Sequence, residues 1–282
     1  MGKDVALVLS SGGARGLAHI GAIEELEAQG YRITSIAGCS MGALIGGVYA
    51  AGKLDEFRDW MKTVDRKKML ELTDFSFSLN HLVKGTRIIE AIMEFVPDVK
   101  IEDLPIPYCA VATDWVTGRE VVFREGSLFE AIRASISLPS FYEPVHRDGM
   151  ILIDGGVTNP IPLNRVVRKE GDILVGVDVS GHDYKAQSEM HHELAEKRKR
   201  STSLSQQILN KLIPDNLEFN YYTMLSRVSS ILIRQNSILM AQLMKPDILV
   251  DIQMARYGGF DFDKSEKLIA IGRQKTLQAL NK

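Results

Sequence analysis

The chain has 282 residues, of which 45% are hydrophobic and 25% charged, and these proportions are typical of a folded globular protein. Its formal net charge of −2 gives no overall electrostatic reason to expect nucleic acid as a partner, and two cysteines do not make a disulfide framework. No apolar run approaches 18 residues, and the N-terminus lacks a signal-peptide pattern. We therefore expect a cytoplasmic protein.

Strand-like and helix-like segments alternate along most of the chain, which is typical of a mainly parallel sheet covered by helices on both faces. The segments with strand character are 5–9, 35–38, 108–114, 121–124, 150–154, 173–179 and 247–252. Those with helical periodicity are 17–29, 43–51, 55–63, 87–95, 128–134 and 264–280. The sequence thus predicts a three-layer α/β fold in which residues 1–282 form a single domain.

Residues 183–245 have a different character, and we interpret them as a helical excursion between two core strands. A charged stretch ends in the basic run 197–200, and a serine-rich stretch follows it. A long helix comes next, with one face formed by Tyr221, Leu225, Val228, Leu232, Leu239 and Leu243. Two interpretations are open for this stripe and for the apolar residues at 69–70, 75 and 77. They form an acyl groove or lid beside the site, or they are packed core or an oligomer contact. The basic run either touches an anionic membrane surface or is a solvated helix end.

The loop at residues 10–16, SSGGARG, connects the first predicted strand to the first predicted helix. Its backbone amides and the helix N-terminus behind them favour an anion. A dinucleotide fingerprint would need glycine where Ser11 stands, and a P-loop would need a Gly-Lys-Ser/Thr sequence that is missing. The loop is therefore either an oxyanion hole, formed by the amides of Gly12, Gly13 and Ala14, or a tight structural turn.

The sequence GCSMG at residues 38–42 is a Gly-x-Ser-x-Gly motif between a predicted strand and a small-residue helix. This setting is that of a nucleophile elbow, in which a sharp turn lifts the serine hydroxyl clear of the sheet. Gly38 and Gly42 allow the close backbone approach, and Ser40 is the candidate nucleophile.

Asp154 ends another predicted core strand and is followed by Gly155 and Gly156. An aspartate before glycine is common in turns, so a purely structural role is one interpretation. Because the carboxyl ends of parallel strands share one sheet edge, we expect Asp154, Ser40 and the first glycine loop to lie together. Asp154 is then the candidate base.

A serine hydrolase usually places a histidine between serine and aspartate. His182 is the strongest candidate, since the order Ser40, Asp154, His182 is that of an α/β-hydrolase triad. Against this, the elbow follows the second strand here, whereas in that fold it comes after several strands. His19 lies on the first predicted helix, and we expect it to pack there.

These motifs together resemble the three signatures of the patatin-like phospholipases. They are the loop at 12–16, the elbow at 38–42 and Asp154-Gly155-Gly156, and further similar segments occur at residues 134–139 and 159–160. The resemblance covers roughly residues 5 to 180. The chain departs from the family pattern at Ser11, where the family loop usually begins with glycine.

The resemblance implies a patatin-type fold and a Ser-Asp dyad, with Ser40 as nucleophile and Asp154 as base and no catalytic histidine. It implies an acyl lipid or phospholipid as substrate, with peripheral membrane contact, and we expect no metal or other cofactor. The motif-supporting residues would be Arg15, Gly16, Gly38, Gly42, Gly155 and Gly156. Arg15 either pairs with a phosphate headgroup or anchors its loop. A low-turnover, lipid-binding regulatory protein is a further alternative.

Overall fold

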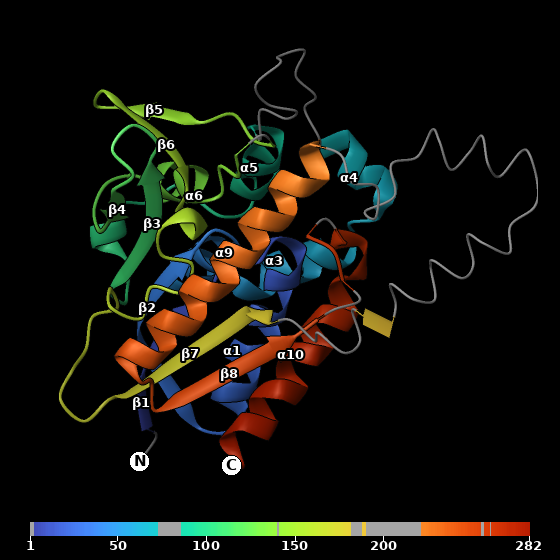
Figure 1. Ribbon diagram of the computed structural model, residues 1–282. Coiled ribbons are helices and arrows are strands. Elements are labelled where there is room, and N and C mark those ends of the chain that lie inside the picture. The colour runs from blue at the N-terminus through green and yellow to red at the C-terminus, as the bar shows by residue number, and fades with distance from the viewer. Residues whose placement is uncertain are drawn as a thin grey trace, which may run out of the picture.

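The computed structural model describes residues 3–72, 86–139, 141–181, 188–189, 221–254, 257–259 and 261–282. These residues form an eight-stranded sheet with helices on both faces, which confirms the predicted α/β fold (Figure 1). In this part of the chain, no helix combines the length and the apolar character needed to span a bilayer.

The sheet has the strand order β5-β6-β3-β2-β1-β7-β8, and β4 pairs with β3 outside this path. The strands are β1 (Lys3–Leu9), β2 (Tyr31–Cys39), β3 (Tyr108–Asp114), β4 (Glu120–Phe123), β5 (Val145–Arg147), β6 (Met150–Asp154), β7 (Ile173–Gly181) and β8 (Ile248–Gln253). Strands β3, β2, β1, β7 and β8 pair in parallel, whereas β4 and β6 pair with β3 in the antiparallel sense and β5 with β6 likewise.

The helices follow the predicted segments closely, with one addition. They are α1 (Ala18–Ala28), α2 (Met41–Ala50), α3 (Leu54–Lys62), α4 (Arg66–Leu72), α5 (Thr86–Met93), α6 (Leu128–Ser135), α9 (Tyr221–Met244) and α10 (Ser265–Leu280). Single 3₁₀ turns are η1 (Gly13–Leu17), η2 (Ile101–Asp103), η3 (Gly155–Val157) and η4 (Phe262–Lys264). Helix α4, which is highly charged, and the three-residue strand β5 were not predicted from the sequence.

Strand β2 is longer than expected, since it begins at Tyr31 and not at residue 35. Its first residues pair with the start of β1, and Arg32 forms a double hydrogen bond to Asp4 across the two strands. The polar side chains that hid this part of the strand are therefore cross-strand partners.

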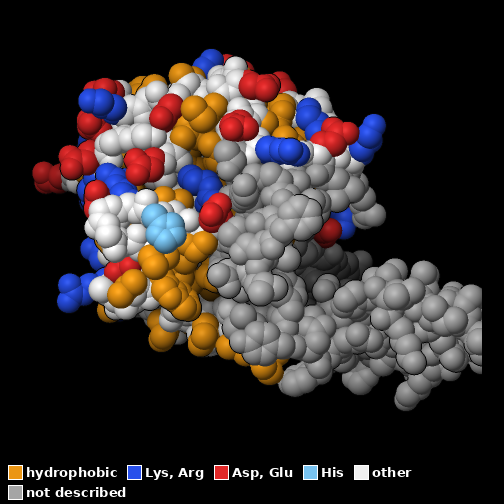
Figure 2. Space-filling model, turned by 90° about the horizontal axis from the view of Figure 1, so that it is seen from above, with side chains coloured by type: hydrophobic (Ala, Val, Ile, Leu, Met, Phe, Trp, Pro, Cys, Tyr) orange, Lys and Arg blue, Asp and Glu red, His pale blue; other side chains and the backbone are white. Residues whose placement is uncertain are grey.

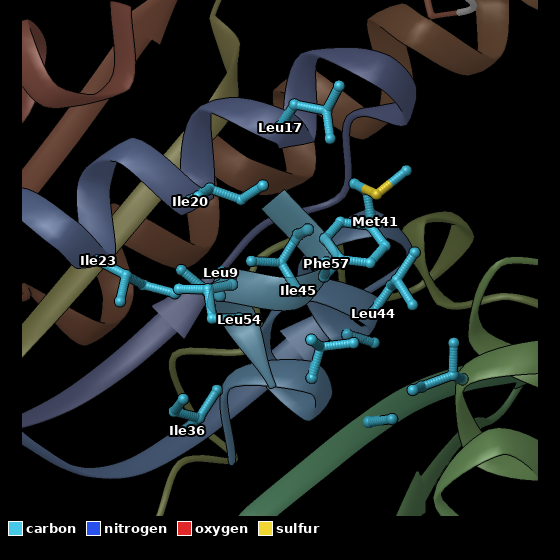
Figure 3. Close-up of a cluster of buried hydrophobic side chains, with 14 of the residues drawn as sticks. Leu9, Leu17, Ile20, Ile23, Ile36, Met41, Leu44, Ile45, Leu54 and Phe57 are labelled. Atoms are coloured by element: carbon cyan, nitrogen blue, oxygen red, sulfur yellow. The ribbon is translucent and has the colours of Figure 1, made fainter. Parts of the chain in front are cut away.

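Two hydrophobic layers cover the two faces of the sheet. Strand β1 alternates between them, because Leu7 and Leu9 face the larger layer and Ala6 and Val8 face the smaller one. The larger layer contains α1, α2 and α3, whose side chains meet around Leu9 (Figure 3). The smaller layer receives Met240 of α9. Figure 1 accordingly shows α9 on one side of the sheet and α1 and α10 on the other.

Candidate active site

The turn between β2 and α2 consists of Ser40 alone, because β2 ends at Cys39 and α2 begins at Met41. Ser40 has φ 54° and ψ −122°, a conformation that costs a non-glycine residue free energy. A Cβ atom on Gly42 would lie 2.2 Å from the carbonyl oxygen of Leu9. A Cβ atom on Gly38 would lie 2.4 Å from the carbonyl oxygen of Gly42. The sharp turn therefore requires glycine on both sides of Ser40.

Strand β3 brings the ends of β2 and β6 together. Cys39 pairs with Val111 and Asp154 with Ala112, and both of these β3 residues pair with β4 on their opposite side. Strands β2 and β6 therefore lie on the same side of β3 and run toward each other. This corrects the expectation that Ser40 and Asp154 follow equivalent ends of parallel strands. Strand β6 is antiparallel, and its carboxyl end meets that of β2 head-on.

Ser40 and Asp154 are in direct contact. The Ser40 Oγ donates a hydrogen bond of 2.6 Å to Oδ2 of Asp154, and the amide of Gly156 donates one of 2.7 Å to Oδ1. The Asp154 residue is only 4% exposed, and this burial raises the pKa of its carboxyl to about 6, against the lowering effect of the two hydrogen bonds. A carboxylate with this pKa is ionised at neutral pH and is a much stronger base than an exposed aspartate.

Hydrogen bonds from side chains of other elements fix the backbone at Ser40 and Asp154. Ser135, at the end of α6, accepts a hydrogen bond of 2.8 Å from the amide of Ser40 and donates one of 2.6 Å to the Val111 carbonyl. The Thr113 hydroxyl donates to the carbonyl of Asp154. This role of Ser135 was not predicted from the sequence, because its partner in the elbow lies 95 positions away in the chain.

The first glycine loop borders this dyad. A Cβ atom on Gly156 would lie 3.1 Å from the Ser11 hydroxyl, and one on Gly16 would lie 2.2 Å from Cγ of Met41. Gly13 has φ +56°, the left-handed region that favours glycine. The loop therefore needs its glycines both for its backbone conformation and for its approach to the elbow.

The amides of this loop are not equivalent as oxyanion donors. Ala14 donates its amide to the carbonyl of Gly259 at 2.7 Å, so this predicted donor is already engaged. Among the described residues, none accepts a hydrogen bond from the amides of Gly12 and Gly13. Arg15 donates from Nε to the Gly12 carbonyl at 3.3 Å, and burial lowers the pKa of its guanidinium. Gly12 and Gly13 are thus the amides with capacity for an anion.

His19 of α1 contacts the first glycine loop. Its Nε2 lies 2.9 Å from the carbonyl oxygen of Ser10, and complete burial lowers its pKa to about 4. A neutral imidazole that donates to Ser10 satisfies this distance. The amide of Val179 donates to the Ser10 hydroxyl at 3.0 Å, which links the loop to β7. His19 therefore packs on α1, as expected from its place in the sequence.

His182, residues 75 and 77, and the basic run 197–200 lie outside the described residues. Met69 packs against the larger hydrophobic layer. Four residues of the predicted α9 stripe are exposed and do not pack in that layer: Val228, Leu232, Leu239 and Leu243.

The arrangement has the parts of an acyl-transfer site. It contains a serine hydroxyl hydrogen-bonded to a buried carboxylate, and a neighbouring loop whose Gly12 and Gly13 amides have no acceptor among the described residues. Within the described ranges, no group of three or more histidine, cysteine, aspartate or glutamate side chains is placed to bind a metal.

Comparison with known proteins gives concordant results. A family model described as patatin-like phospholipase matches residues 7–167. The chain is 46% identical over 179 residues to an uncharacterized NTE family protein of Mycobacterium bovis, covering 64% of this chain and 50% of that protein. It is 31% identical over 189 residues to neuropathy target esterase sws of Drosophila melanogaster, covering 64% and 13%. The chain thus spans half or less of the length of these relatives.

Among solved structures, VipD from Legionella pneumophila is similar to this chain with a TM-score of 0.52 and 15% sequence identity. The superposition covers 99% of this chain and 67% of that one. At this level of identity the likeness concerns the fold.

Proposed function

The chain belongs to the patatin-like phospholipase family, and from this premise we propose that it is a serine lipid acyl hydrolase with Ser40 as nucleophile and Asp154 as base. The observation that carries the proposal is the 2.6 Å hydrogen bond from the Ser40 hydroxyl to a buried carboxylate, inside a strand-turn-helix elbow. The family supports lipid hydrolysis in general, and the direct contact of Ser40 with Asp154 supports the proposal that these two residues carry out that chemistry.

The proposed reaction proceeds in two halves. Asp154 takes the proton of Ser40 as the hydroxyl oxygen attacks the ester carbonyl, and the amides of Gly12 and Gly13 stabilise the oxyanion. Asp154 then gives the proton to the departing alcohol, which leaves an acyl group on Ser40. In the second half, Asp154 accepts a proton from water, the resulting hydroxide attacks the acyl group, and the fatty acid is released as Ser40 regains its proton.

The alternatives differ in what they require of the site. A triad with His182 would need an imidazole between Ser40 and Asp154, and the direct contact of these two side chains favours the dyad. A low-turnover lipid-binding protein would not need a base whose pKa is raised toward neutrality. The bond from Arg15 to the Gly12 carbonyl favours an anchoring role over contact with a phosphate headgroup.

We also propose that residues 1–282 act as one domain. Strand β8 and helix α10 follow the 183–245 segment in sequence, yet β8 pairs with β7 and α10 contacts α1. Both ends of the chain thus contribute to one sheet and its covering layer.

A fluorophosphonate probe followed by a panel of p-nitrophenyl and phospholipid esters tests the proposal. Ser40→Ala should abolish labelling and hydrolysis. Asp154→Asn should lower kcat by several orders of magnitude, because Asp154 is the base that accepts the hydrogen bond of the serine hydroxyl among the described residues. His182→Ala should stay within about tenfold of wild type, which is about 1.4 kcal/mol. Labelling of folded Ser40→Ala would refute the nucleophile, and a His182→Ala variant as inactive as Asp154→Asn would favour the triad.

A further inference from the structure

Helix α9 has the opposite polarity to that expected of a helix on a protein surface. Its inward side carries Ser230, Arg234 and Ser237, and Ser237 is completely buried. Its outward side carries large apolar side chains with exposed fractions between 39% and 74%: Met224, Val228, Ile231, Leu232, Leu239 and Leu243. We call these six residues the outward stripe. A surface helix normally turns such residues toward the core.

An ion-pair network fixes this orientation. Arg234 donates to Asp178 on β7 at 2.8 Å and to Asp251 on β8 at 3.0 Å, and its side chain is only 12% exposed. At the C-terminal half of the helix, Met240 and Met244 pack against the smaller hydrophobic layer. Rotating the outward stripe into the protein would withdraw the guanidinium from both carboxylates, and an uncompensated buried charge is costly. The stripe therefore faces outward because the opposite side is anchored.

The shape and charge of the stripe fit a lipid surface. From Val228 to Leu243 it extends for about 22 Å along the helix, at 1.5 Å per residue. Residues 221–244 include no aspartate or glutamate, and the exposed cations Arg227 and Lys245 lie near its two ends. Large apolar side chains flanked by cations and free of acids are typical of helices that lie in the interface of anionic membranes.

The stripe is also close to the candidate site. Helix α9 contacts β7 and η3, and η3 begins at Gly155, the residue after Asp154. Val157 of η3 is itself an exposed apolar residue. Helix α9 lies at the front of the view in Figure 1, which is the lower edge of the molecule in Figure 2. Hydrophobic side chains gather toward that edge in Figure 2. A bilayer seated on the stripe would thus be beside the turn that holds the base.

We propose that the outward stripe of α9 docks this protein on the surface of anionic phospholipid bilayers, with its long axis in the plane of the interface. The use of the docked lipid as substrate rests on the proposed function, whereas docking itself does not require catalysis. The residues that would enter the interface are those of the stripe, and Arg227 and Lys245 would meet lipid phosphates.

Flotation with vesicles of equal parts phosphatidylcholine and phosphatidylglycerol tests the proposal on the full chain. The Ser40→Ala protein should bind these vesicles, and adding Leu232→Ser and Leu239→Ser should lower its partition coefficient at least tenfold, because two exposed leucines leave the interface. A matched control carries Val116→Ser and Leu277→Ser, which remove exposed apolar residues from other elements and should leave binding unchanged. Arg227→Gln should weaken binding to these vesicles and not to pure phosphatidylcholine.

Three results would overturn the proposal. The first is absence of vesicle binding by the starting protein, and the second is equal binding by the stripe and control variants. The third is a stripe variant that changes from dimer to monomer in size-exclusion chromatography while its vesicle binding persists, since the stripe would then contact a second copy. Vesicle binding is measured with the Ser40→Ala protein, so it does not depend on catalysis. If this protein binds vesicles through the stripe but the wild type hydrolyses no ester, the proposed function is refuted and the docking proposal stands.

Discussion

The dyad and helix α9 use buried polar groups in opposite ways. At the Ser40–Asp154 pair, burial raises the pKa of the Asp154 carboxyl to about 6, which suits the proposed role of this side chain as a base. In α9, Arg234 between Asp178 and Asp251 is a structural anchor, and it leaves the apolar side of the helix exposed. The difference lies in the partners. A buried charge that is hydrogen-bonded to a hydroxyl can act on that hydroxyl as a base, whereas a buried charge between opposite charges fixes the orientation of its helix.

Among substitutions that leave Ser40 and Asp154 in place, the largest effect should come from the backbone of the elbow. Gly42→Ala would place a Cβ atom 2.2 Å from the Leu9 carbonyl, so the turn or β1 must shift. Because misplacement by about 1 Å can cost a hundredfold in rate, kcat/KM for a short ester should fall at least about a hundredfold. Thermal unfolding provides the control for a folded variant. Wild-type activity would show that the elbow tolerates a side chain here.

Removing the anchor of α9 should act on stability. Arg234→Met leaves two carboxylates without their cation, and the free energy of unfolding should fall by about 3–5 kcal/mol in urea denaturation. Arg227→Met is the matched control, because Arg227 is an exposed arginine of the same helix, and it should change stability by less than about 0.5 kcal/mol. Equal effects of the two substitutions would contradict the role of the ion pairs in orienting the helix.

Buried His19 should make stability depend on pH. Its folded pKa is about 4 against an ordinary 6.5, so both states are neutral above pH 6.5. As pH falls from 6.5 toward 4, only the unfolded chain takes up the proton, and stability should decrease by roughly 3 kcal/mol. His19→Gln should reduce this decline, and His146→Gln, which replaces the exposed histidine of β5, is the control substitution. A decline unchanged in His19→Gln would assign it to other groups.

Activity should have its own acid limb. Because Asp154 must be ionised to act as base and its pKa is about 6, kcat/KM for an uncharged ester should fall about tenfold per pH unit below 6. The measurement is a pH–rate profile at pH values where the enzyme stays folded. A limb near pH 4 would mean that the carboxyl has the basicity of an exposed aspartate.

The smallest effect should come from the outward stripe. Leu232→Ser with Leu239→Ser removes apolar groups that the folded chain leaves exposed, so the free energy of unfolding should change by no more than about 0.5 kcal/mol per site. Chemical denaturation measures it, with Ile45→Ser in the larger hydrophobic layer as the contrasting core substitution. A loss of several kcal/mol in the stripe variant would mean that these leucines are covered within the folded chain.

Local pattern determined much of this protein from sequence. Periods of two and of 3.6 residues located the core strands and most helices, because which residues share a face is a property of the backbone alone. The elbow was equally accessible, since Ser40 and the glycines on either side of it form a motif only five residues long. The glycine loop at residues 10–16 was recognised as a turn between strand and helix for the same reason, and its role as an oxyanion hole stays a prediction.

Tertiary structure decided the features that depend on distant partners. The antiparallel direction of β6 brings Asp154 head-on to Ser40, and Gly259 engages the amide of Ala14 from the far end of the chain. The periodicity of α9 showed that its leucines share one side and not whether that side faces in or out. The ion pairs of Arg234 with Asp178 on β7 and Asp251 on β8 fix which side of α9 faces in. An arginine buried without a partner charge would cost more free energy than leaving the apolar stripe exposed.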